Sequence, residues 1–159
     1  MAIEKGDKVP EGSFKHMTAE GMQDLSSDEL FGNKKVVLFS VPGAFTPTCS
    51  NEHLPSYLRH HDEIKSSGFD IIACMAVNDA FVMDAWGKDR GVDDKILMLA
   101  DGNAEYTKKL GLELDASGFG LGIRSKRFSM IVRDGVVETV NVDEGAYDLT
   151  SAEKTCSIG

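Results

Sequence analysis

The sequence has few cysteines and no long hydrophobic run, and both scarcities limit what the protein can be. Three cysteines among 159 residues are an odd number and do not make the disulfide framework of a small secreted protein. The sequence has no run of roughly 18 apolar residues, which is the length that a membrane-spanning helix needs. The N-terminal MAIEKGDKVPEG lacks the apolar core of a signal peptide. We therefore expect a cytoplasmic protein in a reducing compartment, where a cysteine either packs in the core or reacts.

Basic residues are also scarce. Lysine and arginine number 17 against 26 aspartates and glutamates, which gives a formal net charge of -9. The basic residues form only short clusters, at Lys34–Lys35, Lys108–Lys109 and Arg124–Arg127. Phosphate backbones and anionic membranes repel a chain of this charge, so we expect neither nucleic acid nor membrane as a partner. Cysteine and histidine do not occur at the spacing of a zinc site, so we expect no metal.

The remaining composition is that of an ordinary globular protein, with 42% hydrophobic and 27% charged residues. The length corresponds to one domain, and no repeat, low-complexity segment or linker divides the chain. We therefore expect a single domain over residues 1–159 with a core that is stable without disulfides.

Strand patterns and helix patterns alternate along the chain. Short runs rich in β-branched and apolar residues predict strands at 35–41, 70–77 and 95–99. Apolar residues at helical spacing predict helices at 51–67, 79–91 and 104–110. After a glycine-rich loop, Asp134-Gly135 predicts a hairpin turn between strands at 128–132 and 136–142. This order predicts an α/β fold in which a central mixed β-sheet is flanked by helices.

The stretch VPGAFTPTCSNEHLP, residues 41–55, places a thiol where the first strand ends and a helix begins. The first turn of a helix presents backbone N–H groups and the positive end of the helix dipole, which both favour a thiolate at Cys49. Pro42 stiffens the segment, and Gly43 allows the backbone to come close to a ligand. Thr46 can turn its hydroxyl into the same concavity, as a donor or an acceptor.

An unreactive role for Cys49 is the alternative, because free cysteines are most often small buried apolar residues. Thr46 would then serve only as a helix cap. The proline, glycine and threonine around the thiol favour the reactive interpretation, because a residue that only fills the core does not need a rigid frame at the start of a helix.

The motif PGAFTPTC has the form P-x-x-x-T-x-x-C and resembles the peroxidatic loop of the peroxiredoxins. The longer VPGAFTPTCSNEHLP resembles their type-five branch, as do FDIIACMAVNDAFVMDAWGKD, ADGNAEYTKKLGL and RSKRFSMIVRDGVVETVNV. The resemblance covers residues 6–142. It implies a thioredoxin-like fold and a thiol-dependent peroxidase that reduces hydrogen peroxide and alkyl hydroperoxides and needs no metal or organic cofactor.

The resemblance also implies roles for particular residues. It implies that Cys49 is the peroxidatic cysteine and becomes a sulfenic acid, that Thr46 hydrogen-bonds the peroxide and that Pro42 shields the thiolate. It further implies that Arg127, in RSKRFSM, faces the sulfur. A guanidinium is always charged and offers fixed donors to the negative charge that builds on the leaving oxygen. Arg124 is a competing candidate, which spacing alone does not exclude.

His53 lies four residues after Cys49, and therefore on the same helix face. We interpret it as a residue that supports the thiolate or orders the loop, because the sequence shows no second group to orient it for proton transfer. A cysteine hydrolase or acyltransferase is an alternative function, with Cys49 as nucleophile and His53 as base. A third hypothesis is a thioredoxin-fold chaperone or redox-signalling protein without catalysis.

The other two cysteines have different expected roles. Cys74 lies in the apolar run DIIACMAV and is expected to pack in the core. Some members of the type-five branch carry a resolving cysteine near the C-terminus, but the matching position here is Ser151, and Cys156 comes five residues later. We therefore expect a one-cysteine mechanism, recycled by glutathione with glutaredoxin or by thioredoxin. Cys156 remains the alternative resolving residue.

The resemblance also implies a homodimer. Its expected contacts lie near Thr46–Thr48 and around Phe81–Trp86. Peroxide preference would depend on an apolar lining, and the candidates for that lining are Phe45, Leu114, Phe119 and Ile123.

Overall fold

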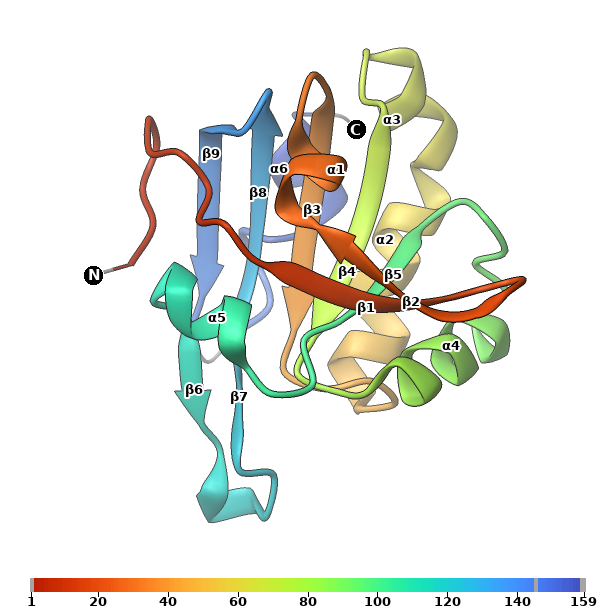
Figure 1. Cartoon of the computed structure of the whole chain (residues 1–159), viewed down its shortest axis with the longest axis vertical. Coiled ribbons are helices and arrows are strands. Elements are labelled where there is room, and N and C mark those ends of the chain that lie inside the picture. The colour runs from red at the N-terminus through yellow and green to blue at the C-terminus, as the bar shows by residue number, and fades with distance from the viewer. Residues whose placement is uncertain (1, 145, 158–159) are drawn as a thin grey trace.

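The structure, a computed structural model, describes residues 2–144 and 146–157 and is built around one mixed sheet (Figure 1). Its strands are β1 (Ser13–Thr18), β2 (Gly21–Ser26), β3 (Lys35–Val41), β4 (Ile71–Ala76), β5 (Leu97–Ala100), β8 (Arg127–Arg133) and β9 (Val136–Asp143). They follow the order β2-β1-β5-β4-β3-β8-β9, with β3, β4 and β5 parallel and β8 and β9 antiparallel to their neighbours. The predicted α/β fold with a central mixed sheet is confirmed.

Helices cover both faces of this sheet. They are α1 (Ser27–Phe31), α2 (Leu54–Arg59), α3 (His61–Ser66), α4 (Ala80–Asp89), α5 (Glu105–Leu110) and α6 (Ala152–Cys156). Val37, Phe39 and Val41 of β3 join the core beneath α2, α3, α4 and α6. Val36 and Leu38 join the opposite core beneath α1 and α5. This alternation buries β3 on both sides, as expected of a central strand. No helix in the described part of the chain is long and apolar enough to cross a membrane.

The predicted strands agree closely with the observed ones. Residues 35–41 form β3, and the predicted C-terminal hairpin forms β8 and β9. At its turn, Asp134 and Gly135 have φ angles of 46° and 78°. Positive φ at both central residues is the type I′ geometry that Asp-Gly favours, because its twist matches that of the flanking strands.

The segment predicted as one helix over 51–67 is divided and begins earlier. Helical backbone starts at Pro47, widens into a π-helical turn, η1 (Cys49–His53), and continues as the separate helices α2 and α3. In η1 the hydrogen bonds run five residues back instead of four. Pro55 follows and has no N–H to donate, so a regular α-helical ladder cannot pass through this point. The prediction of one continuous helix is therefore wrong.

Several elements have no counterpart in the sequence prediction. They are the β1–β2 hairpin, α1, α6 and a small sheet of β6 (Glu113–Asp115) and β7 (Ile123–Ser125), joined through a short turn, η2 (Ser117–Phe119). Phe14 is the one buried residue of β1 and β2, so the hairpin carries no apolar alternation that would predict it. The β6–β7 pair projects from the body of the molecule (Figure 1).

The fold brings separate segments together at one end of β3. Because β8 runs antiparallel beside β3, with Ser40 opposite Phe128, the chain that leaves β3 passes the first residue of β8, Arg127. The loop after β3 then leads directly to Cys49 in η1. A loop, a helix start and a strand start thus converge at this end of the sheet.

Candidate active site

Cys49 lies in the first turn of the helical segment after β3, and its side chain is fully buried. The guanidinium of Arg127 reaches it from the start of β8, with Nη2 3.1 Å from the Cys49 Sγ. The two residues are 78 positions apart and meet because β8 lies beside β3. A fixed cation at this distance stabilises a thiolate, because its N–H groups donate to the negative sulfur.

Arg124, the competing candidate, lies across the loop instead. Its Nε donates to the carbonyl of Leu121 at 3.0 Å, and its Nη1 donates to the carbonyl of Pro42 at 3.4 Å. A Cβ placed on Gly43 would lie 3.0 Å from the same Nη1. The structure therefore brings Arg127 to the sulfur, and Gly43 makes room for the side chain of Arg124.

The loop after β3 is held in one shape by hydrogen bonds. The amide of Ala44 donates to Asn78 Oδ1 at 2.9 Å, and the hydroxyl of Thr46 donates to the carbonyl of Gly43 at 2.6 Å. Phe45 has a φ of 66°, in the left-handed region that a bulky residue rarely adopts. Backbone strain of this kind persists only where the surroundings hold it, and it is concentrated at functional sites.

His53 is buried against Arg127. Its Nδ1 lies 2.8 Å from Arg127 Nη1, and its Nε2 lies 3.0 Å from the backbone carbonyl of Thr150. Because a guanidinium only donates and a carbonyl only accepts, the ring is neutral with its proton on Nε2. Burial, followed by the Arg127 cation, lowers the pKa of His53 to about 3. Sequence reasoning missed Thr150 because a backbone carbonyl 97 residues away carries no side-chain signal.

This arrangement removes the base that a cysteine hydrolase would need. Both ring nitrogens of His53 are engaged, and within residues 2–144 and 146–157 neither is hydrogen-bonded to Cys49 or to a carboxylate. A general base must have a ring nitrogen that can take the proton of the nucleophile. The geometry therefore supports a role for His53 in positioning Arg127.

Aromatic rings pack around His53 and Arg127. Tyr57 stacks on Phe39 with ring centroids 4.0 Å apart, and its hydroxyl donates at 2.9 Å to the same backbone carbonyl that His53 contacts. The ring centroid of Tyr147 lies 5.4 Å from the ring centroid of His53 and 5.9 Å from the Arg127 Cζ. Apolar surroundings of this kind strengthen the hydrogen bonds that they enclose.

The π-helical turn is tied to α4 through Ser50, the neighbour of Cys49. Trp86 Nε1 donates to the Ser50 hydroxyl at 2.9 Å, and Arg90 Nη1 donates to the Ser50 carbonyl at 3.2 Å. Trp86 is fully buried, whereas Phe81 is 63% exposed. The segment around Phe81–Trp86 is predicted to contact a dimer partner. Trp86 belongs to the core instead, and the exposed residues of this segment, such as Phe81, are the ones that can meet a partner.

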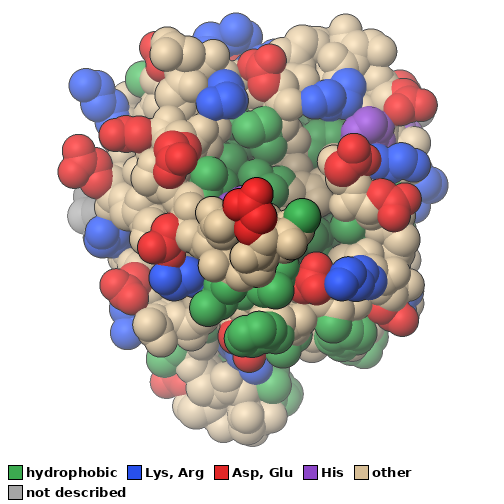
Figure 2. Space-filling model, turned by 45° about the vertical axis from the view of Figure 1, so that its right-hand side comes forward, with side chains coloured by type: hydrophobic (Ala, Val, Ile, Leu, Met, Phe, Trp, Pro, Cys, Tyr) green, Lys and Arg blue, Asp and Glu red, His purple; other side chains and the backbone are tan. Residues whose placement is uncertain are grey.

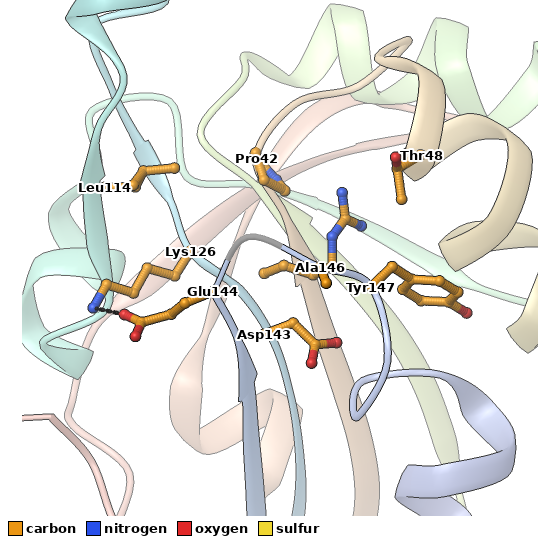
Figure 3. Close-up of a pocket in the computed structure, with 9 residues that line it drawn as sticks. Pro42, Thr48, Leu114, Lys126, Asp143, Glu144, Ala146 and Tyr147 are labelled. Carbon is orange, nitrogen blue, oxygen red and sulfur yellow. Dashed lines mark hydrogen bonds and ion pairs between the residues drawn. The ribbon is translucent and has the colours of Figure 1, made fainter.

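A cavity of about 310 Å³ opens beside Arg127 (Figure 3). Its lining consists of Pro42, Thr48, Leu114, Lys126, Arg127, Asp143, Glu144, Ala146 and Tyr147. Lys126 and Glu144 form an ion pair of 2.6 Å on one side (Figure 3). Of the four apolar lining candidates from the sequence, Leu114 lines this cavity, and the other three are exposed on the surface.

Cys74 and Cys156 are free thiols in surroundings that disfavour a thiolate. Cys74 is buried in β4, and burial raises its pKa well above the ordinary value. Cys156 ends α6, and burial raises its pKa to about 12. Ser151 is the N-cap of α6, and its hydroxyl accepts from the Lys154 amide. Among the described residues, no three His, Cys, Asp or Glu side chains are grouped so as to hold a metal ion.

Comparisons with known proteins agree with this geometry. The chain matches the Redoxin family over residues 4–155. It is 45% identical over 153 residues to Peroxiredoxin-2B of Arabidopsis thaliana, covering 95% of this chain and 94% of that protein. The crystal structure of reduced Prx3 in complex with H2O2 from Vibrio vulnificus is 50% identical, with a TM-score of 0.92 over 96% of each chain. That of peroxiredoxin 5 from Alvinella pompejana is 38% identical, with a TM-score of 0.81 over 96% of this chain and 92% of that one.

These matches confirm the thioredoxin-like fold that the resemblance implied. They extend over nearly the whole chain, and so include both the cysteine loop and the strand that carries the arginine. The chain belongs to the Redoxin family and, within it, to the type-five (type II) branch of the peroxiredoxins, which are thiol peroxidases.

Proposed function

We propose that Cys49 is the peroxidatic cysteine of this thiol peroxidase and that Arg127 is the group that activates it. The observation that carries this proposal is the distance of 3.1 Å between Arg127 Nη2 and the Cys49 Sγ. The other two cysteines are disfavoured because burial raises the pKa of each thiol. Cys49 alone combines a position in the first turn of a helix with a guanidinium contact.

In the proposed reaction, the Cys49 thiolate attacks one oxygen of the peroxide. An S–O bond forms, the O–O bond breaks, and the leaving oxygen takes up a proton and departs as water or an alcohol. The sulfur is oxidised to a sulfenic acid, and the peroxide is reduced. Arg127 stabilises the charge on the leaving oxygen, because its donors already point at the place where that charge develops.

Thr46 and Pro42 shape the place where the peroxide binds in this proposal. The Thr46 hydroxyl gives its own proton to the carbonyl of Gly43, so its lone pairs are left to accept from the O–H of a peroxide. Pro42 lines the cavity beside Arg127 and shields the sulfur with apolar surface.

We propose hydrogen peroxide and alkyl hydroperoxides as substrates. The relative from Vibrio vulnificus was solved in complex with H2O2, which supports the first. Leu114, Ala146 and the ring of Tyr147 offer apolar surface to an alkyl group within the cavity of about 310 Å³ (Figure 3).

We further propose that an external thiol recycles the sulfenic acid. That thiol would attack the sulfur of Cys49 with release of water, and a second thiol would cleave the mixed disulfide. Ser151 occupies the position expected of a resolving cysteine, and the raised pKa of Cys156 disfavours it as an attacking thiolate. Glutathione with glutaredoxin and thioredoxin remain the proposed reductants, and a reducing cytoplasm remains the proposed compartment.

We also propose a homodimer that forms through one apolar face, which consists of Phe45, Phe81, Phe119, Leu121 and Ile123, all exposed. These residues come from the loop after β3, the start of α4 and the β6–β7 arm, which lie at the same end of the molecule (Figure 1). Figure 2 shows hydrophobic side chains reaching the surface in the lower part of the view. Exposed apolar side chains gathered at one end of a molecule favour an interface there.

The catalytic cysteine can be tested by trapping its sulfenic acid. Reduced protein treated with stoichiometric hydrogen peroxide and dimedone should gain one adduct by intact mass, and Cys49→Ser should gain none. Cys74→Ser and Cys156→Ser should both retain the adduct. Peroxide turnover that survives in Cys49→Ser would refute the proposal, and a Cys49–Cys156 disulfide in place of the adduct would refute the one-cysteine mechanism.

Replacing the arginine that contacts the sulfur should slow the reaction with peroxide. Arg127→Gln should lower the second-order rate constant by roughly 100-fold or more, because a charged donor to the transition state is lost. The matched variant Arg124→Gln should change it by less than about threefold, since the hydrogen bonds of that side chain to the described residues go to loop carbonyls. Stopped-flow measurement of both variants decides the assignment, and a larger effect in Arg124→Gln would reverse it.

The buried neutral His53 should make stability depend on pH. Its pKa is about 3 in the folded protein against 6.5 for an ordinary histidine. Between these values the unfolded chain binds more protons, so the free energy of unfolding should fall as the pH is lowered from 6.5 toward 3. The fall from pH 6.5 to about 5 should amount to roughly 1 to 2 kcal/mol.

Urea denaturation over this pH range measures the effect. His53→Gln should flatten the dependence, whereas His61→Gln, at a histidine outside the site, should leave it in place. Equal pH profiles for the wild type and His53→Gln would show that His53 does not carry the effect.

The proposed dimer should dissociate when a charge enters the apolar face. Phe81→Asp should shift the protein to monomers in sedimentation experiments, because a carboxylate would be buried without a partner. Val136→Glu, at an exposed residue at the start of β9, should remain dimeric. A monomeric wild type, or dissociation in both variants alike, would contradict this interface.

A further inference from the structure

Asp143 is a buried carboxylate next to the active-site arginine that takes no direct part in the proposed chemistry. It is the last residue of β9 and the register partner of Arg127 across the β8–β9 pair. It lines the cavity beside Arg127, and its carboxylate points toward the chain that leads into α6 (Figure 3). Within residues 2–144 and 146–157, no ion pair joins it to Arg127.

The carboxylate accepts four hydrogen bonds from the chain that follows. Its Oδ2 accepts from the amides of Asp148 and Thr150, both at 3.0 Å, and from the Thr150 hydroxyl at 2.7 Å. Its Oδ1 accepts from the amide of Leu149 at 2.9 Å. Burial tends to raise the pKa of Asp143, but these bonds outweigh it and hold the pKa below its usual value. Asp143 is therefore a charged anchor for the backbone at Thr150.

The anchored backbone is the part of the chain that holds His53. Thr150 is fully buried, and its carbonyl accepts from His53 Nε2 at 3.0 Å and from the Tyr57 hydroxyl at 2.9 Å. The other ring nitrogen of His53 lies 2.8 Å from Arg127 Nη1, and Arg127 Nη2 lies 3.1 Å from the sulfur. Hydrogen bonds thus connect Asp143 to the thiol, with the covalent backbone of Thr150 as one link between them.

We propose that Asp143 is a positioning residue for the peroxidase reaction. Its carboxylate fixes the carbonyl of Thr150, this carbonyl fixes the ring of His53, and the ring holds the guanidinium of Arg127 on the sulfur. The inference rests on the proposed function in one respect, namely that Cys49 is the reacting thiol.

The indirect connection has a physical advantage over a direct ion pair. A carboxylate bound to Arg127 would neutralise the guanidinium and compete with the thiolate for its donors. Asp143 instead directs its oxygens to backbone amides and a hydroxyl, and Arg127 meets the neutral ring of His53. The full positive charge of the arginine is therefore left for the sulfur and the peroxide.

The chain contains a matched control for this role. Asp101 is also buried and accepts from the Tyr106 amide at 3.1 Å and from the amide and the hydroxyl of Thr107, both at 2.7 Å. It organises α5, on the face of the sheet opposite to α2 and η1. Asp101→Ala removes a comparable anchor without touching the series that ends at Cys49.

The rate of reaction with hydrogen peroxide tests the proposal. Asp143→Ala should lower the second-order rate constant by roughly 10- to 100-fold, because a displaced guanidinium no longer meets the reacting atoms. Asp101→Ala should stay within about twofold of the wild type, since distant sites act independently. Both variants should be destabilised to a similar extent in urea. Asp143→Asn, which keeps one acceptor oxygen, should recover most of the lost rate.

A spectroscopic signature separates positioning from general damage. In ¹H–¹⁵N spectra of the imidazoles, the wild type and Asp101→Ala should show His53 as the neutral tautomer protonated on Nε2. Asp143→Ala should lose this signature. This readout does not involve catalysis, so it stays informative even if Cys49→Ser shows that another residue reacts with peroxide.

The proposal is overturned if Asp143→Ala keeps both the wild-type rate and the His53 signature while losing as much stability as Asp101→Ala. If Asp143→Ala does not fold, Thr150→Val takes its place, because it removes only the hydroxyl contact with the carboxylate. This variant should show a smaller change in the same direction, and an unchanged rate together with an unchanged His53 signature would again reject the proposal.

Discussion

The contact between the guanidinium of Arg127 and the sulfur of Cys49 is the interaction on which the rest of the site depends. A buried thiolate is unstable without a cation beside it, and a buried cation is costly without a partner. The sheet provides this pairing by placing the start of β8 against the end of β3. The strained loop, the π-helical turn and the cavity all lie around that one contact.

Neutral groups hold the arginine in place. His53 accepts from one guanidinium nitrogen and donates to the carbonyl of Thr150, and burial keeps the ring uncharged. Asp143 is the register partner of Arg127 across the β8–β9 pair, and its carboxylate accepts hydrogen bonds from backbone amides and a hydroxyl. The charge of Arg127 is thereby left for the sulfur of Cys49, which is the arrangement that the proposed electrostatic stabilisation of the transition state requires.

Sequence patterns predicted the elements whose residues carry a strong local signal. The apolar run of β3 and the Asp134-Gly135 turn were correct because burial and turn geometry act on neighbouring residues. The β1–β2 hairpin was missed because its strands are mostly exposed. The prediction of one regular helix after Cys49 was wrong, because Pro55 displaces the helical hydrogen bonds without ending the helix.

The sequence by itself determined the family and pointed to Cys49 as the candidate thiol, because PGAFTPTC and the segments that accompany it are local strings whose chemistry can be read in order along the chain. The resemblance implied Arg127, but residue spacing did not exclude Arg124, and the tertiary structure decided between them. Only the tertiary structure showed that Thr150 and Asp143 support this contact. The reason is physical. Strand pairing brings Arg127 to Cys49 across 78 positions, and a backbone carbonyl joins Thr150 to His53 across 97 positions. No local sequence pattern records which groups will meet across such separations.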